Sequence, residues 1–408
     1  MKCRHCQAEM RLVFVDLGSA PLSNAYLTAD MLRAPEKWLP LRVLVCENCW
    51  LVQTEDFAKA DELFDAEYAY FSGFSDSWLT HCKRYVADMV ARFQLSAASH
   101  VVEIAANDGY LLQYVKGLGI PCTGVEPTAR TAAAARAKGI TIVEEFFGAR
   151  VAKELVAQGR KADVLVANNV LAHVPDINDF VAGFTVLLNP AGVATFEFPY
   201  LVKLIAENQF DTIYHEHFSY LSLTAVNRIF SANGLEVFDV EEHPTHGGSL
   251  RVFAQRSETG KRPRAAIVGE MLEREVKLGV TTIGYYSDFQ AKVEKVKNDF
   301  LLFLLASAKA GKTIGAYGAA AKGNTLMNYA GVRRDLISFV VDRNPAKQGR
   351  FMPGSRIPIV TEDQLKQAQP KYVVILPWNL KTEIVQQLDY IMNWGGKFVV
   401  AVPHLEIL

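Results

Sequence analysis

Two histidines, one glutamate and two tyrosines lie within seven residues, from Tyr214 to Tyr220. The packing of a core does not require this density of polar side chains. Imidazole changes its charge near neutral pH, so His215 or His217 can take up or release a proton during a reaction. The same pair could instead chelate a metal ion, although it lacks the i, i+4 spacing of a zinc protease motif. Acid–base chemistry is the interpretation that this cluster favours.

Four of the six cysteines form two Cys-x-x-Cys pairs in the first 49 residues. The pairs are Cys3 with Cys6 and Cys46 with Cys49. Each pair offers two thiolates from one tight turn, and four thiolates complete a tetrahedral zinc site with no open position. A catalytic or redox dithiol is the alternative, which the closed coordination sphere disfavours. A structural zinc ion would stabilise this loop-rich segment, whose core is too small to fold unaided.

The segment from residue 101 to residue 126 has the pattern of a ligand-binding turn between two strands. Residues 101–105 and 122–125 are the predicted strands, and the polar turn after the first of them contains Gly109. Ligands bind beyond the carboxyl ends of the strands in a parallel sheet, and Glu126, which closes the second strand, suits the hydroxyls of a ribose. Gly109 would let the backbone approach a ligand closely. An ordinary turn containing asparagine and aspartate is the alternative.

The turn lacks the dinucleotide-binding glycine fingerprint, and its arrangement E-x-x-x-x-D-G-x-L resembles the S-adenosylmethionine (SAM) loop of class I methyltransferases. Asn168 and Asn169 follow the fourth predicted strand, where their amides are expected to hold the amino-acid part of SAM. His173 faces the cofactor or the substrate, or it is a surface histidine on a capped loop. The residues predicted to bind SAM are Glu103, Asn107, Asp108, Gly109, Tyr110, Glu126, Pro127, Asn168 and Asn169.

Residues 312–324 predict a strand, a glycine-rich turn and the start of a helix. The glycines do not match G-x-G-x-x-G, which disfavours dinucleotide binding of the usual kind. Backbone amides at a helix N-terminus would still hold a phosphate, and Lys322 would add a positive charge. A dimerisation or packing role for this part of the chain is the alternative.

The composition of the chain excludes several classes of protein. Its 408 residues suggest two or three domains. Lys and Arg (43) balance Asp and Glu (44), which gives no electrostatic footprint for nucleic acid. No apolar run approaches the roughly 18 residues of a membrane helix. The start of the chain lacks a signal-peptide core, so we expect zinc rather than disulfides and a cytoplasmic location.

Strand-like and helical patterns alternate between residues 101 and 254, which predicts a doubly wound α/β sheet ending in an antiparallel hairpin. A helix is predicted over residues 78–93, and charged helices over residues 257–310 lead to a second, smaller α/β sheet. The seven strands predicted for the first sheet are 101–105, 122–125, 140–143, 163–167, 193–198, 235–240 and 249–254. After residues 312–324, the second sheet is predicted to use residues 337–341, 372–379 and 397–403.

Three features occur together over essentially the whole chain: the four-cysteine unit, the SAM-type sheet with Tyr-His-Glu-His, and the sequence Gly-Ala-Tyr-Gly-Ala-Ala-Ala-Lys-Gly-Asn. Their combination resembles the sugar C-methyltransferases, which methylate carbon 3 of nucleotide-linked 4-keto-deoxysugars. The resemblance implies a zinc-binding domain (1–66), a Rossmann-like SAM-binding domain (67–256) and a second Rossmann-like domain with a helical connector (257–408). The last of these is expected to bind the nucleotide-diphosphate sugar.

The resemblance also implies Tyr68, His173, Tyr214, Glu216 and His217 as active-site residues. Methylation of carbon requires removal of the proton beside the keto group, and donors must then stabilise the enolate. His217 is assigned as the base and Glu216 as its orienting partner. Tyr214 or Tyr68 is assigned as the donor to the enolate, and His173 has a supporting role. The residues expected to bind substrate are Tyr317, Lys322, Asn324, Asp342, Arg343, Asn344 and Trp378.

Three alternatives belong to other classes or reactions. A SAM-dependent O-methyltransferase could use His217 on a hydroxyl group. A non-catalytic nucleotide-sugar-binding protein would need the C-terminal sheet but not the cluster at residues 214–217. A nucleic-acid methyltransferase or zinc-ribbon regulator would need a basic face, which the sequence lacks. The sugar, the nucleotide, the stereochemistry at carbon 3 and the oligomeric state, a monomer included, stay open.

Overall fold

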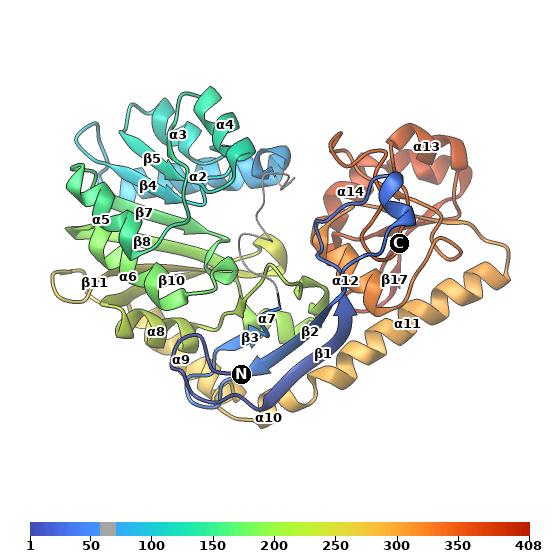
Figure 1. Ribbon diagram of the computed structural model, residues 1–408, viewed down its shortest axis with the longest axis horizontal. Helices are drawn as coiled ribbons and strands as arrows, with labels where there is room; N and C mark the ends of the chain where they lie inside the picture. The colour runs from blue at the N-terminus through green and yellow to red at the C-terminus, as the bar shows by residue number, and fades with distance from the viewer. Residues whose placement is uncertain (58–70) are drawn as a thin grey trace.

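Three β-sheets of four, seven and six strands organise the chain (Figure 1). They are seen in a computed structural model that describes residues 1–57 and 71–408. The four-stranded sheet contains β1 (Leu12–Ala20), β2 (Leu39–Val45), β3 (Val52–Thr54) and β9 (Ser219–Tyr220), in that order and antiparallel throughout. Its first three strands come from the N-terminal part of the chain, whereas β9 comes from the middle of the sequence. The short 3-10 helix η1 (Asp30–Arg33) lies between β1 and β2.

The seven-stranded sheet is the central one, and its strand order is β10-β11-β8-β7-β4-β5-β6. The five strands from β8 to β6 are parallel, and β11 is antiparallel to both β8 and β10. The seven predicted strands and the antiparallel hairpin are therefore confirmed. The strands are β4 (Val101–Ile104), β5 (Cys122–Val125), β6 (Thr141–Val143), β7 (Ala162–Asn168), β8 (Leu188–Pro199), β10 (Leu235–His243) and β11 (Ser249–Arg256).

Helices cover both faces of the central sheet, so its inner strands are buried runs of apolar residues rather than alternating ones. The predicted helix over residues 78–93 is α2 (Asp76–Phe93). The others are α3 (Leu112–Gly117), α4 (Ala129–Ala137), α5 (Ala149–Ala157), α6 (Ile177–Leu187), α7 (Leu201–Ala206), α8 (Leu223–Ala232) and α9 (Ala266–Leu278). Short 3-10 helices are η2 (Ser72–Phe74), η3 (Leu171–His173), η4 (Phe210–Thr212) and η5 (Thr245–Gly247).

The six-stranded C-terminal sheet has the order β14-β13-β12-β15-β16-β17. Its strands are β12 (Ile314–Tyr317), β13 (Val340–Val341), β14 (Ile359–Val360), β15 (Tyr372–Ile375), β16 (Lys397–Val400) and β17 (Glu406–Ile407). Prediction missed the two-residue edge strands β14 and β17, whereas β13, of the same length, lies within the apolar run predicted over residues 337–341. The helices of this part are α12 (Ala321–Tyr329), α13 (Glu362–Ala368) and α14 (Lys381–Gln387), with η6 (Trp378–Leu380) and η7 (Asp389–Trp394).

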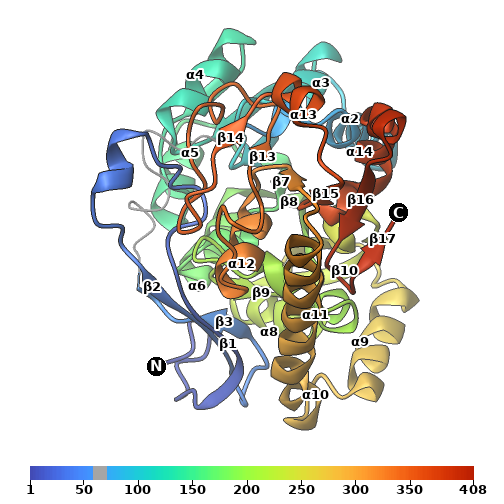
Figure 2. The same ribbon diagram turned by 90° about the vertical axis from the view of Figure 1, so that its right-hand side faces the viewer.

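The connector between the two larger sheets consists of α10 (Gly284–Ser287) and the long helix α11 (Phe289–Lys309). Figures 1 and 2 show α11 running from beside β1 toward the C-terminal sheet. Phe14 of β1 stacks on Phe289 of α11, with ring centroids 4.4 Å apart. One apolar core therefore continues from the N-terminal sheet through α11 into the C-terminal sheet. A second core joins the cysteine turns to one face of the central sheet.

None of the helices within residues 1–57 and 71–408 combines the length and the apolar character that crossing a lipid bilayer requires.

Candidate functional site

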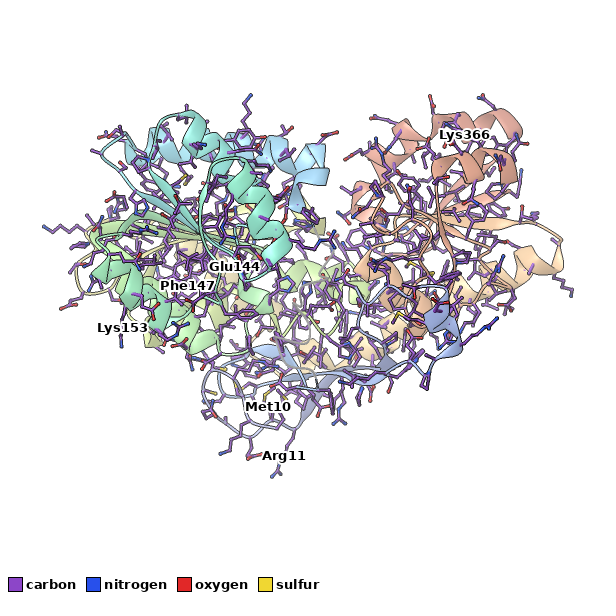
Figure 3. All side chains as sticks on the ribbon, turned by 45° about the horizontal axis from the view of Figure 1, so that its top comes forward. Met10, Arg11, Glu144, Phe147, Lys153 and Lys366 are labelled. Atoms are coloured by element: carbon purple, nitrogen blue, oxygen red, sulfur yellow. The ribbon has the colours of Figure 1, made fainter. Side chains whose placement is uncertain are left out.

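A cavity of about 850 Å³ lies between the central and C-terminal sheets. This volume is in the range of sites that enclose small organic ligands. On the central side, the cavity meets the carboxyl ends of β4, β5, β7 and β8, together with Phe147, which Figure 3 labels. On the C-terminal side it meets the start of α12, Lys347 and Asn379. A single cavity thus touches both of the edges at which the sequence predicted ligands.

The predicted SAM-binding residues divide into two groups. Those that line the cavity are Asn107, Tyr110, Glu126, Pro127, Asn168 and Asn169. Those that do not line it are Glu103, Asp108 and Gly109. Burial raises the pKa of Glu103 well above its usual value, because this carboxyl lies inside β4.

Gly109 is needed for packing rather than for approach to a ligand. Its φ is +75°, and a Cβ atom there would stand 2.4 Å from Cδ1 of Ile140 and 3.3 Å from Cβ of Ala135. The expected reason for this glycine is therefore corrected: the turn must pass close to α4 and the start of β6. The turn itself is held by Glu126, whose two carboxylate oxygens accept from the backbone N–H groups of Asn107 and Thr128, each at 2.9 Å.

Three of the predicted active-site residues lie together in the wall of the cavity. His173, Tyr214 and His217 all line it. The imidazole rings of His173 and His217 meet edge to face with centroids 4.7 Å apart, and the ring of Tyr214 lies 4.0 Å from that of His217. Tyr68 lies outside the described residues.

Hydrogen bonds fix the tautomers of the two histidines. Nδ1 of His217 lies 2.8 Å from the carbonyl oxygen of Thr212, and Nδ1 of His173 lies 2.8 Å from the carbonyl oxygen of Glu216. A carbonyl can only accept, so each Nδ1 carries a proton and donates it. Burial, and for His217 the nearby His173 and Lys322, lower the pKa of His173 to about 4 and that of His217 well below its usual value. Both rings are therefore neutral at pH 7, and Nε2 of His217 carries no proton.

The predicted role of Glu216 as the orienting partner of His217 is wrong. The carbonyl oxygen of Thr212 orients the ring, whereas Oε1 of Glu216 accepts from Nδ2 of Asn24 at 3.1 Å. The two side chains are consecutive along the chain and have different partners. Glu216 does not line the cavity, and its Oε2 has no hydrogen-bond partner among the described residues. Burial raises the pKa of Glu216 to about 7.

A buried carboxyl of this kind predicts a pH-dependent effect of Glu216→Gln on stability. The pKa of Glu216 is raised from 4.5 to about 7 in the folded protein. Between pH 4.5 and pH 7, Glu216 is ionised in the unfolded chain but still protonated in the folded protein. The contribution of Glu216 to the free energy of unfolding therefore falls as the pH rises through this range. Above pH 7 the parent carries a buried charge at a cost on the order of 3 kcal/mol, which glutamine avoids. Denaturant unfolding should therefore favour the variant by about 2–3 kcal/mol more at pH 8 than at pH 5. An equal difference at both pH values would contradict this account.

Several polar residues of the cavity wall were not among the predicted site residues, and Asn24, His246 and Lys347 are three of them. His246 has a φ of +56°, and its Nε2 accepts from Nδ2 of Asn169 at 3.0 Å. The His-Gly-Gly sequence before a predicted strand was a signal for a special turn there. Asn24 carries no such signal, because it reaches Glu216 across 192 residues of sequence.

Of the seven residues predicted to bind substrate, Lys322 lines the cavity and the other six do not. Nζ of Lys322 donates to Oδ1 of Asn379 at 2.8 Å and lies 4.6 Å from the ring centroid of Trp378. Nε1 of Trp378 donates to Oδ2 of Asp211 at 2.7 Å, so the indole joins the C-terminal sheet to the central part. The remaining residues outside the cavity are Tyr317, Asn324, Asp342, Arg343 and Asn344.

Two of these polar residues hold neighbouring backbone instead. Nδ2 of Asn324 donates to the carbonyl oxygen of Ser23 at 2.6 Å. Oδ2 of Asp342 accepts from the backbone N–H of Ala319 at 2.7 Å and lies 3.8 Å from Nζ of Lys347. Each side chain therefore holds backbone next to a residue that lines the cavity, Asn24 in the first case and Ala320 in the second. The sequence shows that these two residues are polar, but it does not show in which direction their side chains point.

The four cysteine sulfurs converge at the N-terminal unit, which we define as residues 1–57. All four Sγ atoms lie within 4.8 Å of one another, and the pairs Cys3–Cys49 and Cys6–Cys46 are 3.5 Å apart. A tetrahedral zinc site with Zn–S distances of about 2.3 Å places its sulfurs about 3.8 Å apart. The geometry therefore fits zinc, and the protein holds a structural zinc ion here.

No other cluster of three or more His, Cys, Asp or Glu with metal-binding geometry occurs in the described part of the chain. Nε2 of His215 lies 3.1 Å from the carbonyl oxygen of Pro40, so this ring has a different partner from that of His217. The alternative of a second metal site at these two histidines therefore has no support.

Three family models match successive parts of the chain. Residues 3–64 match a zinc binding domain, residues 78–240 a methyltransferase domain, and residues 244–403 a C-methyltransferase C-terminal domain. The third match includes β11, which belongs to the central sheet. Along its whole length the chain is 34% identical over 407 residues to the C-methyltransferase NovU of Streptomyces niveus, of which the alignment covers 96%.

Two solved structures resemble a part of the chain. The magnesium protoporphyrin IX methyltransferase ChlM of Synechocystis PCC 6803, with bound SAM, is 17% identical over 44% of this chain and 79% of that one, with a TM-score of 0.34. The CcbJ methyltransferase of Streptomyces caelestis is 16% identical over 43% of this chain and 89% of that one, also with a TM-score of 0.34. Likeness at this level carries no argument about substrate.

Proposed function

The chain belongs to the family of SAM-dependent C-methyltransferases, and from this premise we propose that it methylates carbon 3 of a nucleotide-diphosphate-linked 4-keto-deoxysugar. The observation that carries the proposal is the state of His217. This ring is neutral, donates through Nδ1 to a backbone carbonyl and so keeps Nε2 unprotonated at the wall of the cavity. A fixed, unprotonated imidazole nitrogen is a group that can abstract a proton from carbon.

The proposed reaction begins with proton removal. Carbon has no lone pair to offer a methyl group, so the C–H bond beside the keto group must first lose its proton to Nε2 of His217. The electron pair of that bond then forms an enolate, whose oxygen needs a hydrogen-bond donor. Tyr214, beside His217, is the donor that we assign. Bound SAM supplies the electrophilic methyl group.

The low pKa of His217 has a consequence for this step. An imidazolium at this site is disfavoured by burial and by the nearby His173 and Lys322. Proton transfer to His217 is therefore favourable only if negative charge develops on the substrate at the same time, because the two charges then stabilise each other. Loss of a proton from a carbon beside a keto group places that charge on the keto oxygen, so this electrostatic environment is compatible with an enolisable substrate.

The lysines of the cavity support a phosphorylated substrate. Lys322 and Lys347 both line the wall on the C-terminal side. An ammonium group without water around it is stabilised by an anion, and a diphosphate supplies two charges within a few ångströms. Both lysines belong to residues 257–408, to which we assign binding of the nucleotide sugar. We assign zinc binding to residues 1–66 and SAM binding to residues 67–256.

Lys322→Met tests the diphosphate assignment. Methionine keeps an unbranched stem over the indole of Trp378 but lacks the charge. The KM for the nucleotide sugar should rise at least tenfold, the lower end for loss of a hydrogen bond to a charged group, while SAM affinity stays near that of the parent. Lys366→Met on α13, an exposed lysine (Figure 3), is the matched control and should change neither quantity. A fall in SAM affinity with Lys322→Met would show that the lysine belongs to the cofactor site.

The function itself is tested by incubating the enzyme with methyl-labelled SAM and a panel of nucleotide sugars. The panel pairs each 4-keto-deoxysugar with its 4-hydroxy counterpart. Label should appear only with the keto members, and NMR should locate it on carbon 3. Label on an oxygen, or transfer to the hydroxy members, would establish O-methylation instead. Absence of transfer to any member would overturn the assigned substrate class.

A further inference from the structure

We infer that the N-terminal unit positions the proposed base, and that Thr54 is the positioning residue that connects the two. This inference rests on the proposed role of His217. The N-terminal unit contains the zinc site, yet one strand of its sheet is β9, which begins two residues after His217. The strand that follows the base along the chain therefore belongs to the same sheet as the N-terminal strands next to the cysteine turns.

Hydrogen bonds from β3 hold the backbone of the base directly. Oγ1 of Thr54 donates to the carbonyl oxygen of His217 at 3.1 Å, and the backbone N–H of Thr54 donates to the carbonyl oxygen of Phe218 at 3.2 Å. Beyond them, Gln53 pairs with Ser219 in the β3–β9 ladder. Thr54 is 2% exposed, so water does not compete for its hydroxyl group.

The other side of β3 is held by the first cysteine turn. Nε2 of Gln53 donates to Sγ of Cys3 at 3.3 Å, and Oε1 of Gln53 accepts from the backbone N–H of Arg4 at 2.9 Å. Nη2 of Arg4 donates to the carbonyl oxygen of Thr54 at 2.9 Å. A continuous set of buried hydrogen bonds thus runs from a zinc ligand to the backbone of His217. Side chains that bond to metal ligands fix the orientation of those ligands, and here the same side chain belongs to the strand beside the base.

The residues just before His217 are held by the same unit. His215 donates through Nε2 to the carbonyl oxygen of Pro40, and Glu216 accepts from Asn24. The ring of His217, in contrast, is oriented from the central part of the chain by the carbonyl oxygen of Thr212. The backbone of the base and its ring therefore have separate anchors. Loss of the backbone anchor should displace the ring without removing it.

Three substitutions of Thr54 separate the hydroxyl group from the shape of the side chain. Thr54→Ser keeps the donor, Thr54→Val keeps the shape, and Thr54→Ala keeps neither. A displacement of about 1 Å can reduce a rate by about a hundredfold, so we expect turnover to fall about tenfold in Thr54→Val and Thr54→Ala. Turnover of Thr54→Ser should stay within about twofold of the parent. Zinc content, SAM affinity and the KM for the sugar should be unchanged in all three.

Val15→Ala is the matched control for stability. Val15 is fully buried in β1 of the same sheet, two strands away from β3. Its substitution should lower the melting temperature at least as much as Thr54→Val does, but leave turnover at the parent value. If Thr54→Val does not fold, the comparison of Thr54→Ala with Thr54→Ser decides, because those two differ by one hydroxyl group alone.

The ¹⁵N chemical shifts of the His217 ring, assigned with the help of His217→Asn, give a readout that needs no substrate. They should change in Thr54→Val and Thr54→Ala and match the parent in Thr54→Ser and Val15→Ala. Unchanged ring shifts in the first two variants would overturn the inference. It would also fall if SAM affinity and zinc content declined together with turnover, since Thr54 would then be a general stabilising residue. If the parent methylates no nucleotide sugar, the proposed function fails. The ¹⁵N shifts of the His217 ring still decide whether Thr54 positions that ring.

Discussion

Replacement of His217 by asparagine should lower turnover by a factor of about 10²–10⁴, the usual scale for loss of a general base. Asparagine retains a hydrogen-bond donor near the carbonyl oxygen of Thr212 but has no group that accepts a proton at neutral pH. Exchange of the substrate carbon-3 proton with D₂O, measured with S-adenosylhomocysteine in place of SAM, should fall by the same factor. SAM affinity should change little, because Asn107 and Glu126, which are proposed to bind SAM, belong to other elements than His217.

His173→Asn is the control that separates the two neighbouring imidazoles. The rings of His173 and His217 are 4.7 Å apart, and both are neutral at pH 7 because their pKa values are lowered. If His217 is the base, His173→Asn should retain proton exchange at a rate much closer to the parent. A parent-like rate of proton exchange in His217→Asn, with loss of exchange in His173→Asn, would show that His173 rather than His217 is the base.

The pH dependence of turnover follows from the same pKa values. A base acts in its neutral form, and burial keeps the pKa of His217 well below 6.5. This group therefore causes no loss of activity between pH 8 and pH 6.5. Glu216 has a pKa raised to about 7 and lies next to the base in sequence. Any inflection near pH 7 that disappears in Glu216→Gln belongs to Glu216 rather than to the imidazole.

The central sheet was predictable from sequence because its signals are local. Apolar runs such as Ala162–Asn168 alternate with amphipathic helices, and each strand needs only its own residues to be recognised. The cysteine pairs were equally readable, since each pair brings its two ligands together within one turn. Both kinds of feature are determined mainly by neighbours in the chain.

The side-chain directions at the cavity were not predictable, because they depend on contacts between distant segments. Thr54 reaches His217 across 163 residues of sequence, and Trp378 reaches Asp211 across 167. Trp378 was expected at the substrate on the strength of its position after a strand. Its indole instead donates to the buried carboxyl group of Asp211 in η4, a contact between distant segments that no local sequence pattern records.

Of the predicted changes in stability, loss of the zinc ion should cause the largest. Cys46→Ser removes one of four thiolates, and a hydroxyl group is a poor replacement as a zinc ligand. Structural zinc contributes about 10–16 kcal/mol to the folding of small zinc domains at pH 7, which is as much as the whole stability of a typical domain. We therefore expect Cys46→Ser to contain less than one zinc ion per chain and to aggregate or to melt at a much lower temperature.

Cys122→Ser is the matched control, because Cys122 lies in β5 of the central sheet away from the zinc site and should leave the zinc content at one ion per chain. The cysteine turns share an apolar core with one face of the central sheet, so loss of zinc should destabilise more than the N-terminal unit. Removal of zinc from the parent by a chelator should reproduce the melting behaviour of Cys46→Ser, and added zinc should reverse it. Parent protein purified without a chelator and found free of zinc, yet melting as a stable fold, would contradict the structural role of the four cysteines.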